Sequence, residues 1–161
     1  MPRDDDRAFE DALRRHERRV LRTAWRVMGS LEDAQDVAQE VFLKLHRHFN
    51  QVEPATMEAW LYRTTLNACF DGLRRRRPAE PLDSEPAVAP EIDLERDERR
   101  RLVAAALRTL PERERAAVVL REIEGLSTAE AAAALGTSEG TVRSQISLAK
   151  AKLRRWLENR R

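Results

Sequence analysis

The chain has 161 residues, of which 42% are hydrophobic and 36% charged, and its formal net charge is +2. This fits one ordinary soluble domain or two small ones. No apolar run approaches the ~20 residues that span a bilayer, and the polar N-terminus lacks a signal core, so a cytoplasmic protein without membrane insertion is expected. The single cysteine, Cys69, excludes an internal disulfide and a cysteine-rich zinc site, and we expect it to be a small buried hydrophobe.

Strong helix formers dominate the composition and predict an all-α fold. In chain order, residues 1–77 show three helical patterns with apolar residues at three- and four-residue spacing. The first pattern ends at Gly29, and Ser30 is placed to cap the second. Thr56 is expected to cap the third, which runs to about Arg77. His16 falls on the apolar stripe of the first helix and is predicted to be a core residue.

Residues 78–93 are predicted to form a flexible acidic linker. Four of the seven prolines fall there, and residues 78–98 carry a net charge of −7. Proline removes backbone donors, and an acidic segment with few large apolar groups has little to bury. The chain is thus predicted to contain two small helical domains, 1–77 and 94–161. Residues 99–161 carry a net charge of +7, which suits a polyanionic partner.

A helix-turn-helix is predicted from about Ser127 to Trp156. Ser127 and Glu130 form a capping box before a short alanine-rich helix, Gly136 is placed for a left-handed turn, and Ser138 can cap the long helix that follows. Two helices joined by a tight glycine turn are typical of DNA-binding motifs, whose second helix enters the major groove. A plain helical hairpin with a basic surface is the alternative.

These residues resemble a known family. The C-terminal part resembles region 4, the −35 binding domain, of bacterial sigma factors of the extracytoplasmic-function (ECF) group in the sigma-70 family, and the N-terminal part resembles region 2. The matching segments are Leu110–Glu114 (LPERE), Glu124–Ser127 (EGLS) and Gly140–Ser144 (GTVRS) for region 4, and Asp33–Leu43 (DAQDVAQEVFL) and Trp60–Asp71 (WLYRTTLNACFD) for region 2. Their order, with a linker between them, is more specific than any one motif.

The resemblance implies a non-enzymatic subunit that binds core RNA polymerase, recognises promoter DNA and helps to open it. It places polymerase contacts, with the clamp helices of the largest subunit, at Asp33, Asp36, Gln39 and Glu40, where a solvated helix face is the alternative. It places −10 DNA contacts at Asn50, Gln51, Arg63, Asn67, Asp71, Arg74, Arg75, Arg76 and Arg77. For the arginine run, a charged helix end is the alternative. Trp60 is expected in the core rather than as a base platform.

For the −35 element, the resemblance implies contacts from Ser138, Glu139, Thr141, Arg143, Ser144, Gln145, Leu148, Lys150 and Lys152. Arg and Gln can hydrogen-bond base edges, and Lys can bind phosphate. The chain departs from the family at Gln145 and Leu148, where relatives often carry Arg, and we expect weak binding to an isolated −35 duplex. The loop from Asn50 to Thr56 also departs from the commoner Arg-Gly-Glu form, which affects its base preference.

Partners expected from the family are core polymerase, including its flap region for the C-terminal domain, promoter DNA and an anti-sigma factor. No cofactor, metal or small-molecule substrate is expected. A repressor or activator that acts without polymerase is one alternative, although no dimerisation helix is apparent. An enzyme is the other, but no metal or nucleophile motif surrounds His16, His46 or His48.

Overall fold

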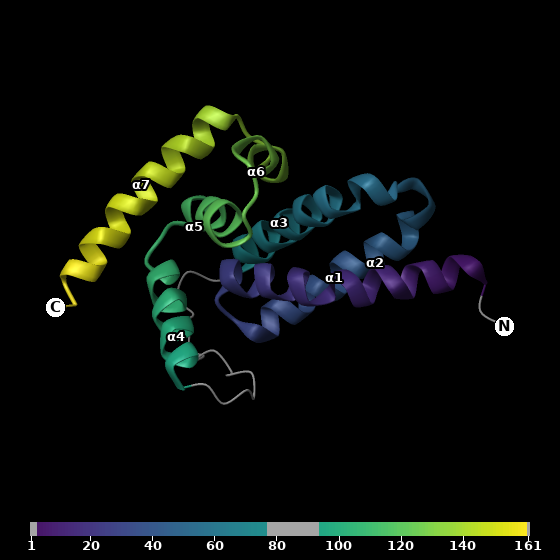
Figure 1. The fold of residues 1–161 in the computed structure, drawn as a ribbon, viewed down its shortest axis with the longest axis horizontal. Coiled ribbons are helices and arrows are strands. Elements are labelled where there is room, and N and C mark those ends of the chain that lie inside the picture. The colour runs from purple at the N-terminus through teal and green to yellow at the C-terminus, as the bar shows by residue number, and fades with distance from the viewer. Residues whose placement is uncertain (1–2, 77–93, 161) are drawn as a thin grey trace.

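The computed structural model describes residues 3–76 and 94–160, and within these ranges the fold is all-helical, as predicted (Figure 1). None of the described helices is long and apolar enough to cross a membrane. The α-helices are α1 (Asp4–Met28), α2 (Leu31–His48), α3 (Met57–Arg75), α4 (Leu94–Arg108), α5 (Glu112–Val118), α6 (Thr128–Leu135) and α7 (Glu139–Glu158); η1 (Phe49–Gln51) and η2 (Pro54–Thr56) are 3₁₀ turns, and η3 (Val119–Ile123) is a π-helical turn.

The first three helices form an N-terminal unit, which we define as residues 3–76. Gly29 ends α1 with a φ of 77°, a conformation that favours glycine, and the Ser30 hydroxyl accepts a hydrogen bond from the Asp33 amide to begin α2. Both caps confirm the sequence prediction. The core contains apolar residues from all three helices, and it also contains His16, which is 9% exposed. Burial lowers the pKa of His16.

The start and the end of α3 differ from the sequence prediction. Thr56 occupies the N-cap position, but its hydroxyl donates to the Glu53 carbonyl instead of accepting a bond from the helix, so the predicted side-chain cap is wrong. The helix ends at Arg75. Arg77 and the predicted linker, residues 78–93, lie outside the described residues.

The last four helices form the C-terminal unit, residues 94–160, and its caps confirm the predicted helix-turn-helix. Ser127 and Glu130 form a complete capping box at the start of α6. Gly136 ends that helix with a φ of 65°, and the Ser138 hydroxyl accepts the Thr141 amide at the start of α7. Pro111 occupies the N-cap of α5, which begins at Glu112.

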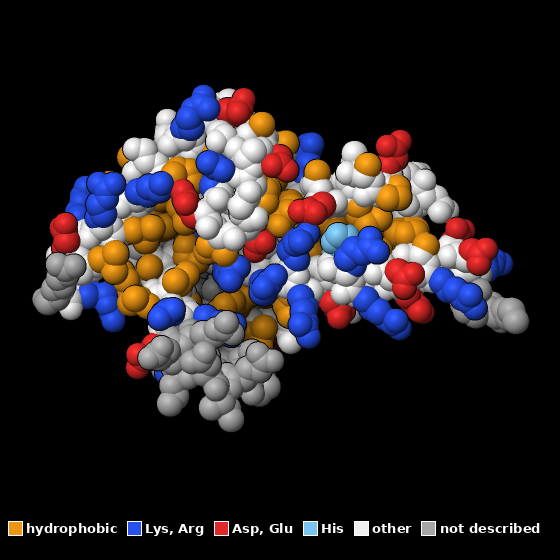
Figure 2. Space-filling model, viewed as in Figure 1, with side chains coloured by type: hydrophobic (Ala, Val, Ile, Leu, Met, Phe, Trp, Pro, Cys, Tyr) orange, Lys and Arg blue, Asp and Glu red, His pale blue; other side chains and the backbone are white. Residues whose placement is uncertain are grey.

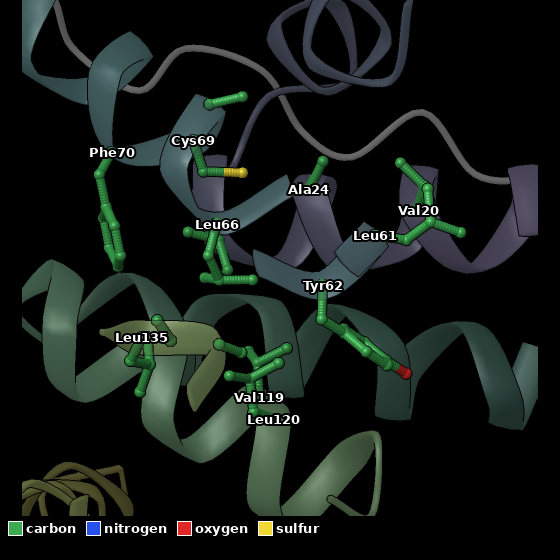
Figure 3. Packing of buried hydrophobic residues seen from close by; sticks show 14 of the residues in the cluster. Val20, Ala24, Leu61, Tyr62, Leu66, Cys69, Phe70, Val119, Leu120 and Leu135 are labelled. Carbon is green, nitrogen blue, oxygen red and sulfur yellow. The ribbon is translucent and has the colours of Figure 1, made fainter. Parts of the chain in front are cut away.

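The two units pack against each other, and α3 lies between them. Figure 3 shows Tyr62, Leu66 and Phe70 of α3 pointing towards Val119, Leu120 and Leu135 of the C-terminal unit. The opposite side of α3, which includes Leu61 and Cys69, faces α1 and α2. Because α3 packs on both sides, the apolar core runs through both units without a break. Burial also raises the pKa of the Cys69 thiol to about 12.

The guanidinium of Arg115 joins the units at the edge of this core. The side chain belongs to α5, and the residue is 7% exposed. Its nitrogens donate to the carbonyls of Leu107 at 2.9 Å, Leu110 at 2.8 Å and Val27 at 2.6 Å. Val27 belongs to α1, so one buried cation satisfies backbone acceptors at the ends of helices in both units.

Replacing this cation should destabilise the whole chain. An Arg115→Met substitution keeps much of the side-chain volume but removes the guanidinium from three buried carbonyls, of which that of Leu107 keeps its bond from the Leu110 amide, and we expect a loss of roughly 3 kcal/mol in unfolding free energy. Urea denaturation followed by circular dichroism measures the loss. Arg101→Met, at an exposed position of α4, is the matched control and should change little. Equal midpoints for the two variants would contradict this role of Arg115.

Candidate nucleic-acid and protein interfaces

The N-terminal turns of α7 present polar side chains to solvent. Five of the predicted −35 contacts in this part of the helix are exposed: Ser138, Glu139, Thr141, Arg143 and Ser144. Val142 and Ala149 are buried on the opposite face against the rest of the C-terminal unit. The helix therefore offers a small polar face at the end that a helix-turn-helix inserts into the major groove.

The two positions at which the chain departs from the family differ in environment. Leu148 is exposed, as expected, with 55% of its surface accessible. Gln145, which is also a predicted DNA contact, is only half-exposed, and its Oε1 is buried without a hydrogen-bond partner. Gln145 is half-buried because it follows the buried Val142 by three residues on α7 and so lies near the edge of the face that packs against the rest of the unit.

The two lysines of α7 have different partners. Lys150 forms an ion pair with Glu122 at 3.1 Å, and both side chains are about half-exposed. The Nζ of Lys152 lies 2.9 Å from both carboxylate oxygens of Glu114, whose side chain is only 11% exposed. Lys150 can therefore exchange its partner for a phosphate at little cost, whereas Lys152 would leave a buried carboxylate unpaired.

One face of α3 carries the predicted −10 contacts. Arg63, Asn67 and Arg74 are exposed, and Asp71 is half-buried and forms an ion pair with Arg74. This face is separate from the apolar side that packs against the C-terminal unit. Polar and cationic groups in one row along a helix can contact successive nucleotides.

The rest of the predicted −10 set is scattered around this face. Arg75 is exposed, and Arg76 turns back to pair with Asp33 and to donate to the Met28 carbonyl. Asn50 and Gln51 are exposed in η1, where Gln51 hydrogen-bonds His48 at 3.3 Å. Within the arginine run, Arg75 is thus exposed to solvent, whereas Arg76 is engaged with its own unit.

The predicted polymerase contacts lie along α2. Asp36 and Gln39 are exposed, while Glu40 pairs with Lys44 and Asp33 pairs with Arg76. Beside them, between α1 and α2, runs an apolar groove of about 600 Å³ that sequence reasoning missed. Leu43, on the rim of the groove, is 54% exposed. A large apolar residue outside the buried stripe of α2 is the sequence feature that could have indicated this groove. Other lining residues are Phe9, Leu13, Leu21, Ala38 and Phe42.

A second apolar surface, also missed, lies in the C-terminal unit. Figure 2 shows hydrophobic side chains gathered between α7 and α4 on the left of the view. Leu102 and Val103 in α4 and Leu157 in α7 are 40%, 44% and 49% exposed. Large exposed apolar side chains that gather on one side of a small unit indicate a protein-binding surface.

No group of histidine, cysteine and carboxylate side chains that could hold a metal ion occurs among the described residues. The carboxylates of Glu124, Asp33 and Glu114 form ion pairs with Arg26, Arg76 and Lys152.

Comparison with known proteins accounts for both units. Residues 12–79 match the family Sigma-70 region 2, and residues 100–153 match Sigma-70, region 4. The chain is 38% identical over 156 residues to the ECF RNA polymerase sigma factor SigM of Mycobacterium tuberculosis, covering 95% of this chain and 79% of that protein. It is 40% identical over 158 residues to the ECF RNA polymerase sigma factor SigE of Mycolicibacterium smegmatis, covering 93% of this chain but only 62% of that protein.

Solved structures agree with the fold. The chain is 31% identical to CnrH, solved in complex with the cytosolic domain of CnrY, with a TM-score of 0.71 over 95% of this chain and 89% of that one. The sigma factor RpoE, solved with the anti-sigma factor NepR from Bartonella quintana, gives a TM-score of 0.76 at 24% identity, covering 96% and 99% of the two chains. Both likenesses extend over the two units. The chain therefore belongs to the ECF group of sigma factors in the sigma-70 family, whose members are non-enzymatic and direct RNA polymerase to promoters.

Proposed function

We propose that this chain binds core RNA polymerase, directs it to promoters through −10 and −35 elements, and promotes opening of the DNA. The observation that carries this proposal is that one chain holds two separate exposed polar surfaces, each at a predicted DNA contact. One is the row on α3 that includes Arg63 and Asn67, and the other is the N-terminal end of α7 with Thr141 and Arg143. A two-part promoter needs both.

Polymerase is bound through each unit. The exposed Asp36 and Gln39 on α2 suit arginine side chains on the clamp helices of the largest subunit. Asp33 serves indirectly, since its ion pair with Arg76 ties the start of α2 to the end of α3. The apolar surface between α4 and α7 suits an apolar segment of the flap region, which would cover Leu102, Val103 and Leu157.

Opening of the promoter requires no catalytic side chain. Binding to unpaired −10 bases by the exposed face of α3 and by the Asn50–Gln51 turn shifts the equilibrium from duplex to open DNA. The −35 surface has few cations, because Leu148 and the half-buried Gln145 stand where relatives often carry Arg. Polymerase compensates by holding both units near the DNA at a high effective concentration.

A regulatory protein partner of the anti-sigma kind is part of this proposal. CnrH, the solved structure at 31% identity, was determined with a protein domain bound. The apolar groove between α1 and α2 and the apolar surface between α4 and α7 are both open to such a partner. A partner that covered them would compete with polymerase.

Adding positive charge to the exposed face of α2 should weaken polymerase binding. In a pull-down with purified core polymerase, Asp36→Arg with Gln39→Arg should weaken binding at least tenfold, because two cations would face cationic partner side chains. Glu10→Arg, at an exposed position of α1, is the control for added positive charge. Wild-type binding by the double variant would contradict the assigned surface. Failure of the wild type to bind, with DNA binding intact, would favour a polymerase-independent regulator.

The two lysines of α7 should behave differently on promoter DNA. Lys150→Ala removes a phosphate contact and should lower the slope of log affinity against log salt by about one. Lys152→Ala should leave that slope unchanged and reduce the thermal stability instead, because Glu114 loses its partner. Filter binding of the polymerase complex across a salt series measures the slope. Equal slope changes for both variants would contradict these roles.

A further inference from the structure

The second half of α1 carries a group of arginines that none of the predicted contacts uses. Residues 14–26 contain six arginines and a single acidic residue, Glu17, so this stretch has a net charge of +5. Basic side chains are frequent in Figure 2 over the part of the surface where Figure 1 draws α1. Four of the arginines are exposed, and we call them the α1 arginine face: Arg14, Arg15, Arg18 and Arg22.

The register of the helix places these side chains on one side. Arg14, Arg18 and Arg22 follow one another at four-residue spacing, so they form a row with a rise of about 6 Å between neighbours. The opposite side of α1 is buried in the core and includes Val20 and Ala24. The packing that buries one side of α1 therefore also holds the row of arginines towards solvent.

The arginines at the border of the face have acidic partners, whereas those of the face have none. Arg19 pairs with Glu58 at 3.1 Å, and Arg26 pairs with Glu124 at 3.3 Å. Within residues 3–76 and 94–160, no ion pair or side-chain hydrogen bond engages the four residues of the α1 arginine face. Glu124 also accepts hydrogen bonds from two other side chains of the N-terminal unit, Thr23 and Tyr62.

This concentration of like charge does not stabilise the helix. Side chains four residues apart are neighbours on a helix surface, so Arg18 is repelled by both Arg14 and Arg22. By contrast, α2 pairs Glu40 with Lys44 at the same spacing. A row of cations that opposes the stability of its own helix, and that has no partner within the described parts of the chain, indicates an anionic partner outside it.

The composition of the face favours nucleic acid over protein as that partner. The centre of a protein interface is usually apolar or aromatic, whereas nucleic-acid interfaces are polar and strongly positive. Only Arg18 of the four lines the apolar groove, which lies towards α2. Arginine can bind a phosphate through two parallel hydrogen bonds. The large apolar side chains exposed in the described residues all lie outside α1: Leu43, Leu102, Val103, Leu148 and Leu157.

The α1 arginine face and the predicted −10 face belong to different sides of the N-terminal unit. Leu61 and Cys69 of α3 face α1 and α2, whereas Arg63 and Asn67 are exposed on another side of α3. Since α1 packs against the buried side of α3, its own exposed face is directed away from that helix. A strand held by Arg63 and Asn67 therefore cannot supply the phosphates for the α1 arginine face, and another stretch of DNA must do so.

We propose that the α1 arginine face is a third DNA-binding surface, which binds the phosphate backbone of duplex DNA without regard to sequence. This inference goes beyond the proposed function, because it involves neither the −10 nor the −35 contacts. Phosphate contacts position a protein on a duplex but do not read its bases. The face thus contributes affinity and salt dependence, and leaves the choice of promoter to α3 and α7.

The test uses the full-length chain and a labelled duplex of mixed sequence, without polymerase. One variant combines Arg14→Gln, Arg18→Gln and Arg22→Gln, and its matched control carries lysine at the same three positions and so keeps the charge. Fluorescence anisotropy across a salt series gives the affinity and its salt dependence. Circular dichroism checks the fold, and the glutamine variant should melt no lower than the wild type because it loses the repulsion along α1.

We expect the glutamine variant to bind the duplex at least about tenfold more weakly at low salt. Its slope of log affinity against log salt should fall by about two to three, because each phosphate contact contributes about 0.9. The lysine variant should keep the wild-type slope. An unchanged slope in the glutamine variant would overturn the proposal.

A polyglutamate peptide distinguishes a protein-binding surface from a DNA-binding one. If the peptide binds the wild type but not the glutamine variant, while both bind the duplex equally, the face is a site for an acidic protein and the proposal is wrong. Because polymerase is absent from these measurements, a chain that failed to bind polymerase would contradict the proposed function without affecting this test.

Discussion

Glu124 places a carboxylate, 8% exposed, among three donors from the opposite unit. Arg115 places a cation among two carbonyls of its own unit and the Val27 carbonyl across the same boundary. Two buried charges of opposite sign therefore fix how the units dock. Each has its full set of partners only while the units are together, because all three donors to Glu124 lie on α1 and α3, and one of the three acceptors of Arg115 lies on α1. The apolar packing of α3 adds affinity to this boundary, but these charges determine its geometry.

The three sides of α3 show how one helix serves several roles. Leu61 and Cys69 face the core of the N-terminal unit, Tyr62 and Leu66 face the C-terminal unit, and the row through Arg63 is exposed to solvent. The docked state therefore covers an apolar surface without covering the predicted −10 face. Docking restrains the distance between the two predicted DNA-binding surfaces. It therefore affects whether both surfaces can reach their promoter elements at the same time.

The features that could be predicted from the sequence are those set by local chemistry. The caps at Ser127, Gly136 and Ser138 need only their own neighbours, and so the helices and turn of the helix-turn-helix could be predicted, although α7 continues to Glu158, beyond the predicted end at Trp156. The side-chain partners of Arg76 and Lys152 could not be predicted, because Asp33 and Glu114 are far away in the chain. The docking of the units was missed for the same reason, since no periodicity indicates that Glu124 would turn towards Thr23. The roles of the predicted DNA and polymerase contacts stay predictions.

The most direct test is the distance between the units in the unbound chain and in the promoter complex. Spin labels on cysteines introduced by Arg22→Cys in α1 and Ala133→Cys in α6 can report it, because the native Cys69 thiol is buried and stays unlabelled. The account predicts a single short distance in the unbound protein and an increase of tens of ångströms with core polymerase and promoter DNA, in keeping with the ~85 Å between the elements. The same short distance in both states would contradict it.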